Sequence, residues 1–265
     1  MDITRRNLLA AAALQLPAPK PGVTHYVRYS AGGAATYGRL EGDRIQPLAG
    51  SIFDNPKPAG KPVPASQVKL LYPCQPPKVL AVGLNYKSHI GNRPAPTRPE
   101  IFYKPVTCLQ NPGDPIVIPP GSKNTHYEGE IVIVIGKEPN RIFGYTCGND
   151  VSERDWQNGP DKDLQWWRAK GADTFGPMGP AIAAGLDPKP SLLQTRLNGA
   201  VVQKQYVSDL LFDCEAIVSF ISRYVTLTPG DVIFTGTPGT TAAMKPGDVV
   251  EVEIDGIGIL RNPVK

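Results

Sequence analysis

The sequence predicts a β-rich α+β fold. Residues 130–135 form a continuous β-branched run, typical of a strand buried on both faces, and residues 249–254 alternate apolar residues with glutamate, as a half-exposed strand does. Proline (29) and glycine (27) are frequent among the 265 residues, so many short strands and tight turns are expected. The one strong helical spacing of apolar side chains covers residues 210–224.

Residues 21–72 are expected to form a small N-terminal subdomain. Residues 23–29 alternate like a strand, Gly32 and Gly33 indicate a turn, and residues 37–48 have the pattern of a hairpin. The proline-rich stretch 56–64 predicts a linker or an extended loop. We therefore expect a second, larger domain over residues 73–265.

The larger domain should begin with a short apolar strand at 79–82, and the polar, proline-rich residues 91–99 predict an exposed loop. Asp209 is the expected N-cap of the helix predicted over 210–224. Two Pro-Gly-Asp triplets, at 229–231 and 246–248, each precede a valine-rich strand and predict turns.

Residues 1–20 resemble a signal segment. Arg5 and Arg6 precede a short alanine-rich apolar run that ends at Leu16, as in bacterial twin-arginine signals. The run is too short to span a bilayer as a helix, so no integral membrane segment is expected. The pattern predicts export to the periplasm; the alternative is an N-terminal arm on a cytoplasmic enzyme.

Composition argues against several other classes of protein. The net charge is +4 and the basic residues are scattered, so no nucleic-acid partner is expected. The four cysteines lie far apart without a C-x-x-C pair, which argues against a zinc ribbon or a thioredoxin-like site. Buried free thiols are the expectation for all of them.

Glu128 and Glu130 are the first candidates for chemistry. Side chains two residues apart on a strand point to the same face, so these carboxylates should stand together at the edge of a dry core. They would repel each other unless one held a proton or a hard divalent cation such as Mg²⁺, Mn²⁺ or Ca²⁺ lay between them. Asp150 follows the same strand after a short connection and could join them. The alternative is an exposed Glu-Gly-Glu turn.

Several further motifs follow one another in a fixed order along the chain. They are Gly83-Leu84-Asn85-Tyr86 with His89, Phe102-x-Lys104-Pro105, Tyr127-Glu128-Gly129-Glu130, Asn149-Asp150-Val151-Ser152-x-Arg154-Asp155, Lys170-Gly171-x-Asp173-Thr174-Phe175-Gly176-Pro177, Pro229-Gly230-Asp231-Val232-Ile233 and Thr235-Gly236-Thr237-Pro238. This ordered set resembles the fumarylacetoacetate hydrolase family. The resemblance covers roughly residues 75–265 and implies a mixed β-roll and a homodimer.

The resemblance implies a role for each matching residue. Mg²⁺ or Mn²⁺ would be held by Glu128, Glu130 and Asp150, and a 2-oxo acid would chelate it. Lys170 would be a fixed cation beside the developing enolate. The remaining implied residues are Arg154 and Gln157 around the reacting part of the substrate, and Thr237, Gly236 and Lys104 in substrate binding.

His89 matches the family's water-activating base, which lies on a lid and pairs with a glutamate three residues later. Here that position is Asn92, which can orient an imidazole but adds no charge. Glu100, beyond the loop, is a possible substitute. The expected function is a metal-dependent hydrolase that cleaves a C–C bond in an acylpyruvate-like acid. The alternatives are a decarboxylase, tautomerase or hydratase/lyase on the same scaffold, or a protein that binds 2-oxo acids without turnover.

Overall fold

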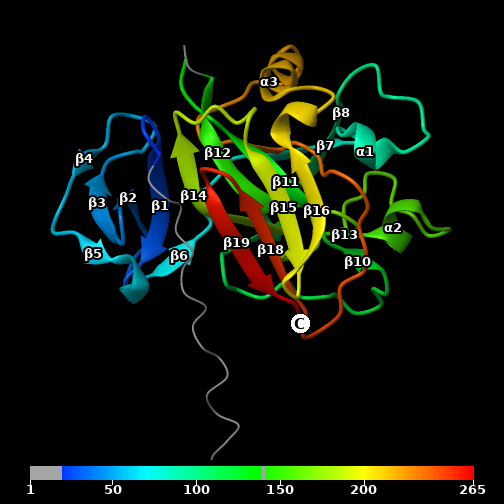
Figure 1. Cartoon of the computed structure of the whole chain (residues 1–265), viewed down its shortest axis with the longest axis horizontal. Helices are drawn as coiled ribbons and strands as arrows, with labels where there is room; N and C mark the ends of the chain where they lie inside the picture. The colour runs from blue at the N-terminus through cyan, green and yellow to red at the C-terminus, as the bar shows by residue number, and fades with distance from the viewer. Residues whose placement is uncertain (1–19, 139–140) are drawn as a thin grey trace, which may run out of the picture.

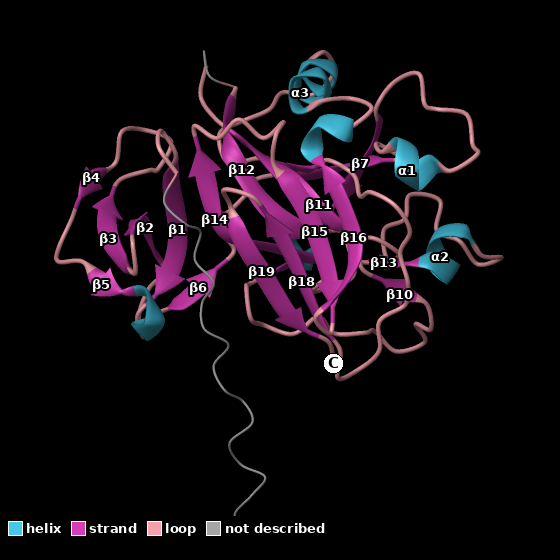
Figure 2. Ribbon diagram, viewed as in Figure 1, coloured by secondary structure: helices cyan, strands magenta, loops and turns pink. Residues whose placement is uncertain are grey.

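The computed structural model describes residues 20–138 and 141–265. The predicted signal segment, except for Lys20, lies outside the described residues. No helix within the described ranges has the length and apolar character needed to cross a membrane. Strands greatly outnumber helices (Figure 2), which confirms the predicted β-rich α+β class.

The first strands form an antiparallel meander at one side of the molecule (Figure 1). The hairpin predicted over 37–48 is present, and its two strands pair from Tyr37 with Leu48 to Glu41 with Arg44. The stretch predicted as a linker contains two short strands that pair with the hairpin, so it is partly sheet. The elements are β1 (Thr24–Ser30), β2 (Thr36–Glu41), β3 (Arg44–Ala49), β4 (Lys57–Pro58), β5 (Val63–Pro64), the 3-10 turn η1 (Ala65–Gln67) and β6 (Lys69–Leu71).

β1 continues this meander into the central sheet by pairing with β14. From β14 the order across the central sheet is β14-β12-β11-β17-β7-β8, with β9 added beside β14. Its strands are β7 (Val79–Gly83), β8 (Glu100–Lys104), β9 (Leu109–Gln110), β11 (Gly129–Ile135), β12 (Ile142–Asn149), β14 (Gly176–Ala184) and β17 (Val232–Phe234).

A second sheet of four strands lies over β11, β12 and β14 (Figure 1). Val250, Val252 and Ile254 of this sheet are buried while Glu251 and Glu253 are partly exposed, as the alternating sequence predicts. The strand order is β16 (Ala200–Tyr206), β15 (Leu192–Leu197), β18 (Val249–Ile254) and β19 (Gly258–Pro263).

β11 is buried on both faces. Ile131 and Ile133 pack into the core under the four-stranded sheet, and Val132 and Val134 pack into a second core on the opposite face. The continuous β-branched run is thus explained by two apolar surroundings rather than one. The four cysteines are buried and free, as expected.

The remaining elements are short. They are α1 (Lys87–Ile90), α2 (Arg154–Asn158), α3 (Cys214–Ser222), the 3-10 turns η2 (Val106–Cys108) and η3 (Val207–Asp209), and the paired strands β10 (Thr125–His126) and β13 (Ser152–Glu153). In Figure 1, α3 lies above the sheets, and α1, α2, β10 and β13 lie along their right side.

The start of α3 differs from the prediction. Its N-cap is Asp213, whose side chain accepts a hydrogen bond from the backbone N–H of Ala216 at 2.9 Å, and Asp209 lies in η3. The backbone N–H groups of Leu211 and Phe212 both donate to Asn85, at 2.8 Å each. This side-chain and backbone pairing holds the segment out of helical conformation, so the helix begins only after it.

Candidate active site

The three predicted carboxylates meet at the beginning of β11. Gly129 pairs with Asn149 across the antiparallel β11–β12 ladder, which places Glu128 and Glu130 next to Asp150. One carboxylate oxygen from each residue lies within 4.8 Å of the others, and all three side chains are buried. Hard divalent cations prefer this set of oxygen donors.

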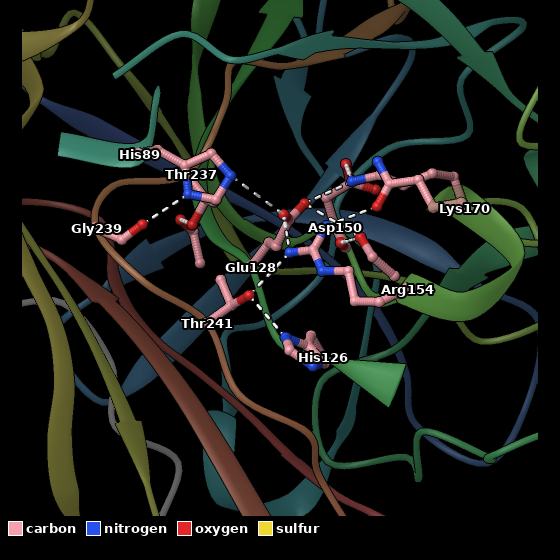
Figure 3. Close-up of polar contacts among 12 residues, drawn as sticks. His89, His126, Glu128, Asp150, Arg154, Lys170, Thr237, Gly239 and Thr241 are labelled. Carbon is pink, nitrogen blue, oxygen red and sulfur yellow. Dashed lines mark hydrogen bonds and ion pairs between the residues drawn. The ribbon is translucent and has the colours of Figure 1, made fainter. Parts of the chain in front are cut away.

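Cations surround this carboxylate cluster unevenly (Figure 3). The Lys170 ammonium donates to Glu128 at 2.5 Å and to Asp150 at 2.6 Å. The Arg154 guanidinium donates to Glu128 Oε1 at 2.5 Å. Glu130 accepts the backbone N–H of Gly236 at 2.7 Å, and none of the ion pairs among the described residues includes it.

The pKa shifts have opposite directions at the two glutamates. Burial would raise the pKa of Glu128, but the charges of Arg154 and Lys170 outweigh it and hold that pKa below its usual range. Burial raises the pKa of Glu130, and the charges of Asp150 and Glu128 raise it further. Glu130 is therefore the one carboxylate of the cluster that forms no ion pair among the described residues, and a bound divalent cation would favour its ionised form.

Lys170 keeps its charge in this setting. Burial would lower the pKa of its ammonium, but Asp150 and Glu128 outweigh burial and raise that pKa. Two of its three N–H groups point to carboxylates, so one remains for another acceptor. The ammonium also lies 5.3 Å from the centre of the Phe102 ring.

His89 extends from α1 toward the same cluster. Its Nδ1 lies 2.6 Å from the backbone oxygen of Gly239, so the proton must be on Nδ1 for that hydrogen bond to form. In the neutral imidazole Nε2 is then the acceptor, and it lies 3.9 Å from Glu128 Oε1. The Gly239 backbone N–H donates to Ser88 at 3.0 Å, which ties α1 to this loop a second time.

Neither Asn92 nor Glu100 is the partner of His89. Asn92 is exposed, and Glu100 is exposed with its carboxylate 3.8 Å from Arg98. The carbonyl of Gly239 instead orients the imidazole. It orients the ring as a carboxylate would but adds no full negative charge.

A cavity of about 320 Å³ opens over the carboxylate cluster. Phe102 and Trp166 form an apolar part of its wall, with their rings edge-to-face at 5.4 Å. On the polar side, Arg154 donates to Gln157 at 2.7 Å, and both line the cavity. The other charged or titratable side chains of the lining are His89, Arg93, Glu128, Glu130 and Lys170.

The match to a known family agrees with this geometry. Residues 78–265 match the fumarylacetoacetate (FAA) hydrolase C-terminal family, and residues 24–73 match the Rv2993c-like, N-terminal family. The chain belongs to the fumarylacetoacetate hydrolase family. The predicted resemblance is confirmed.

Relatives within the fumarylacetoacetate hydrolase family differ in activity. A mitochondrial oxaloacetate tautomerase of Xenopus laevis is 40% identical over 75% of this chain and 69% of its own. A 2-hydroxyhepta-2,4-diene-1,7-dioate isomerase structure from Mycobacterium marinum is 38% identical, with a TM-score of 0.84 over 91% of this chain and 98% of its own. The maleylpyruvate hydrolase of Sphingobium sp. SYK-6 in complex with manganese and pyruvate is 26% identical, with a TM-score of 0.72 over 91% and 98%. The chain is thus an enzyme of this family.

Lys104 does not reach the cavity. Its buried ammonium donates to Asp150 at 2.6 Å and to the backbone oxygens of Lys170 and Phe175, and it is absent from the cavity lining. This position behind Asp150 argues against the contact with substrate that the family resemblance implied. Lys104 instead holds a carboxylate of the cluster and the backbone that bears Lys170.

The Thr-Gly-Thr loop lies at the cluster. Thr237 lines the cavity, and its hydroxyl donates to the Gly129 carbonyl at 2.9 Å and accepts from Gln203 at 2.8 Å. The N–H of Gly236 is committed to Glu130 rather than directed at a substrate. A side chain at Gly236 would meet the Cβ of Asn85 at 2.8 Å, and its φ of +105° also favours glycine.

Sequence reasoning missed several polar residues around Arg154. The hydroxyl of Thr241 lies 2.9 Å from the Arg154 guanidinium and 2.8 Å from His126 Nδ1 (Figure 3). Ser152 donates to Glu128 at 3.2 Å. Ser152 belongs to the Asn-Asp-Val-Ser motif of residues 149–152, so the sequence offered a signal for it. Thr241 and His126 belong to no recognisable pattern.

Proposed function

We propose that this enzyme interconverts the keto and enol forms of a small 2-oxo acid with a divalent cation as cofactor. The observation that supports this proposal best is the position and orientation of the His89 imidazole. Its Nε2 is an acceptor that faces the carboxylate cluster, and a backbone carbonyl fixes the ring from behind. One positioned base is sufficient to move a proton between carbon and solvent.

The carboxylates of Glu128, Glu130 and Asp150 would hold the cation. Mg²⁺ and Mn²⁺ fit these oxygen donors, and Ca²⁺ fits them too. When bound, the cation would polarise the 2-oxo group and stabilise negative charge on its oxygen. A related structure in complex with manganese supports this choice of cofactor.

The chain's own residues would move the proton. His89 Nε2 accepts a proton from the carbon next to the 2-oxo group, and the electrons of that C–H bond form the C=C bond as the carbonyl electrons move onto oxygen. The free N–H of Lys170 donates to this oxygen while charge develops. A proton from solvent then adds to the oxygen and completes the enol, while His89 releases the proton it took from carbon to solvent; the reverse sequence restores the ketone.

Hydrolysis of a C–C bond is the second candidate. The similarity to maleylpyruvate hydrolase favours it, at 26% identity, whereas the similarity to oxaloacetate tautomerase is 40%. Hydrolysis requires deprotonation of water, for which the family pairs the histidine with a glutamate. This chain has the exposed Asn92 at that place, so the simpler proton transfer fits the site better.

The test is to incubate the Mg²⁺-loaded enzyme with oxaloacetate in D₂O and follow the C3 protons by NMR. We expect faster exchange of these protons with the carbon skeleton intact, and loss of this acceleration in His89→Ala. Acetylpyruvate is examined in parallel for cleavage into acetate and pyruvate. Cleavage without accelerated exchange would replace the proposed function by the hydrolase.

A further inference from the structure

Arg93 lines the cavity from the segment that follows α1. Its Nε donates to the backbone oxygen of Ile90 at 3.1 Å, and its Nη2 donates to that of His89 at 3.3 Å. These two bonds use two of the five N–H groups of the guanidinium and fix its direction. Three N–H groups remain for a ligand.

Arg93 is an exposed residue that has no acidic partner among the described side chains. Lys104, Lys170 and Arg154 each form an ion pair with a carboxylate of the cluster. Arg93 is in none of the ion pairs found over residues 20–138 and 141–265. Among the charged side chains that line the cavity, Arg93, Arg154 and Lys170 already outnumber Glu128 and Glu130, and a bound divalent cation would add further positive charge.

We propose that Arg93 binds a second carboxylate of the substrate, so that the enzyme prefers 2-oxo dicarboxylic acids to their monocarboxylic counterparts. The inference rests on the proposed function in one respect, since the first carboxylate and the oxo group must bind at the cluster. The planar guanidinium matches a carboxylate in a two-bond arrangement, which an ammonium cannot reproduce. Its hydrogen bonds to the end of α1 hold that arrangement before substrate arrives.

The test compares two acids of equal length. Calorimetry on the Mg²⁺-loaded protein measures binding of 2-oxoglutarate and of 2-oxopentanoate, in which a methyl group replaces the second carboxylate. Because a charge-assisted hydrogen bond contributes about 1.5–3 kcal/mol, the wild type should bind the dicarboxylate at least about tenfold more tightly. Arg93→Ala should abolish this preference, and Arg93→Lys should keep part of it.

Arg98→Ala is the matched control. Arg98 is exposed on the same loop, lies 3.8 Å from Glu100 and does not line the cavity, so the preference should remain in this variant. Equal binding of both acids by the wild type would overturn the inference, and so would a preference that survives in Arg93→Ala. A normal preference without C3 proton exchange would contradict only the proposed function, and exchange without a preference only the role of Arg93.

Discussion

β17 has a buried carboxylate group near each of its ends, and only one of the two is paired with a cationic side chain. At its start, Asp231 accepts the backbone N–H of Lys78 at 3.0 Å, its ammonium at 2.8 Å, and the backbone N–H of Thr228 at 2.7 Å. Beyond its other end, the N–H of Gly236 donates to Glu130, within a cluster of three acids. The first acid has its own cation, and Glu130 has none among the described side chains.

The difference separates a structural ion pair from a ligand site. A buried carboxylate that is paired and hydrogen-bonded stabilises its surroundings, but an unpaired one is costly. A folded protein can keep a buried, unpaired carboxylate at a place where a bound ligand offsets its cost in free energy. The charge balance therefore predicts which acids bind a cation, and substitutions at the two ends should behave in opposite ways.

The largest expected effect is the loss of metal binding. Glu128→Ala or Asp150→Ala should weaken Mn²⁺ binding by at least about 100-fold, because partners that only orient a ligand already contribute about 10–100-fold. Asp231→Ala, at the other end of β17, should bind Mn²⁺ as the wild type does. Calorimetric titration measures all three. Unchanged Mn²⁺ affinity in both cluster variants would contradict the three-carboxylate site.

The next effect concerns turnover. His89→Ala should slow C3 proton exchange by about 10²- to 10⁴-fold, the usual contribution of a general base. Mn²⁺ affinity should remain, since His89 lies beside the cluster without belonging to it. If His89→Ala exchanges protons at the wild-type rate, the base lies elsewhere.

A smaller effect distinguishes the two lysines. Lys104→Met removes one of the two ammonium groups that pair with the buried Asp150, and Lys170 remains. In chelator it should lower the free energy of unfolding by less than the about 3–5 kcal/mol that a fully broken buried ion pair costs. Mn²⁺ should restore part of this loss because it supplies positive charge. Lys78→Met should also destabilise the protein, less strongly since Lys78 is partly exposed, and Mn²⁺ should restore none of that loss. Equal recovery in both variants would remove the distinction between the two sites.

The smallest effect is expected at Asn92. Asn92→Glu should change the exchange rate by less than about threefold, well below the usual contribution of a general base, because the Gly239 carbonyl already accepts the Nδ1 proton of His89. It should also weaken the preference for dicarboxylic acids, since the new carboxylate lies next to Arg93. A tenfold faster enzyme would indicate that the glutamate displaces Gly239.

The sequence was sufficient where local pattern decides the structure. The apolar run of β11, the alternation of β18 and the proximity of Glu128 to Glu130 all follow from neighbouring residues. The start of α3 did not, because Asn85 binds the segment before it from more than a hundred residues away. Apolar spacing cannot show such a competing hydrogen bond.

The direction of side chains was the other feature that the sequence could not predict. The family resemblance implied that Lys104 binds substrate, but its ammonium turns behind Asp150 to two backbone carbonyls. The partner of His89 was equally hidden, since a backbone oxygen leaves no trace in residue identity. Both outcomes depend on how β8 and the loop after β17 pack, which sequence spacing does not determine.

The most direct test of the unbalanced acid is thermal unfolding of Glu130→Gln, with chelator and with Mn²⁺. In chelator, the neutral amide should make the protein more stable than the wild type by about 1–3 kcal/mol. The raised pKa of Glu130 means that the native state holds either a buried charge or a proton that the unfolded state has lost at neutral pH, and the amide avoids both costs. Mn²⁺ should stabilise the wild type and have no effect on the variant. Asp231→Asn should show the reverse pattern, with lower stability in chelator and a normal Mn²⁺ effect. A Glu130→Gln protein that is destabilised in chelator and still stabilised by Mn²⁺ would contradict the account.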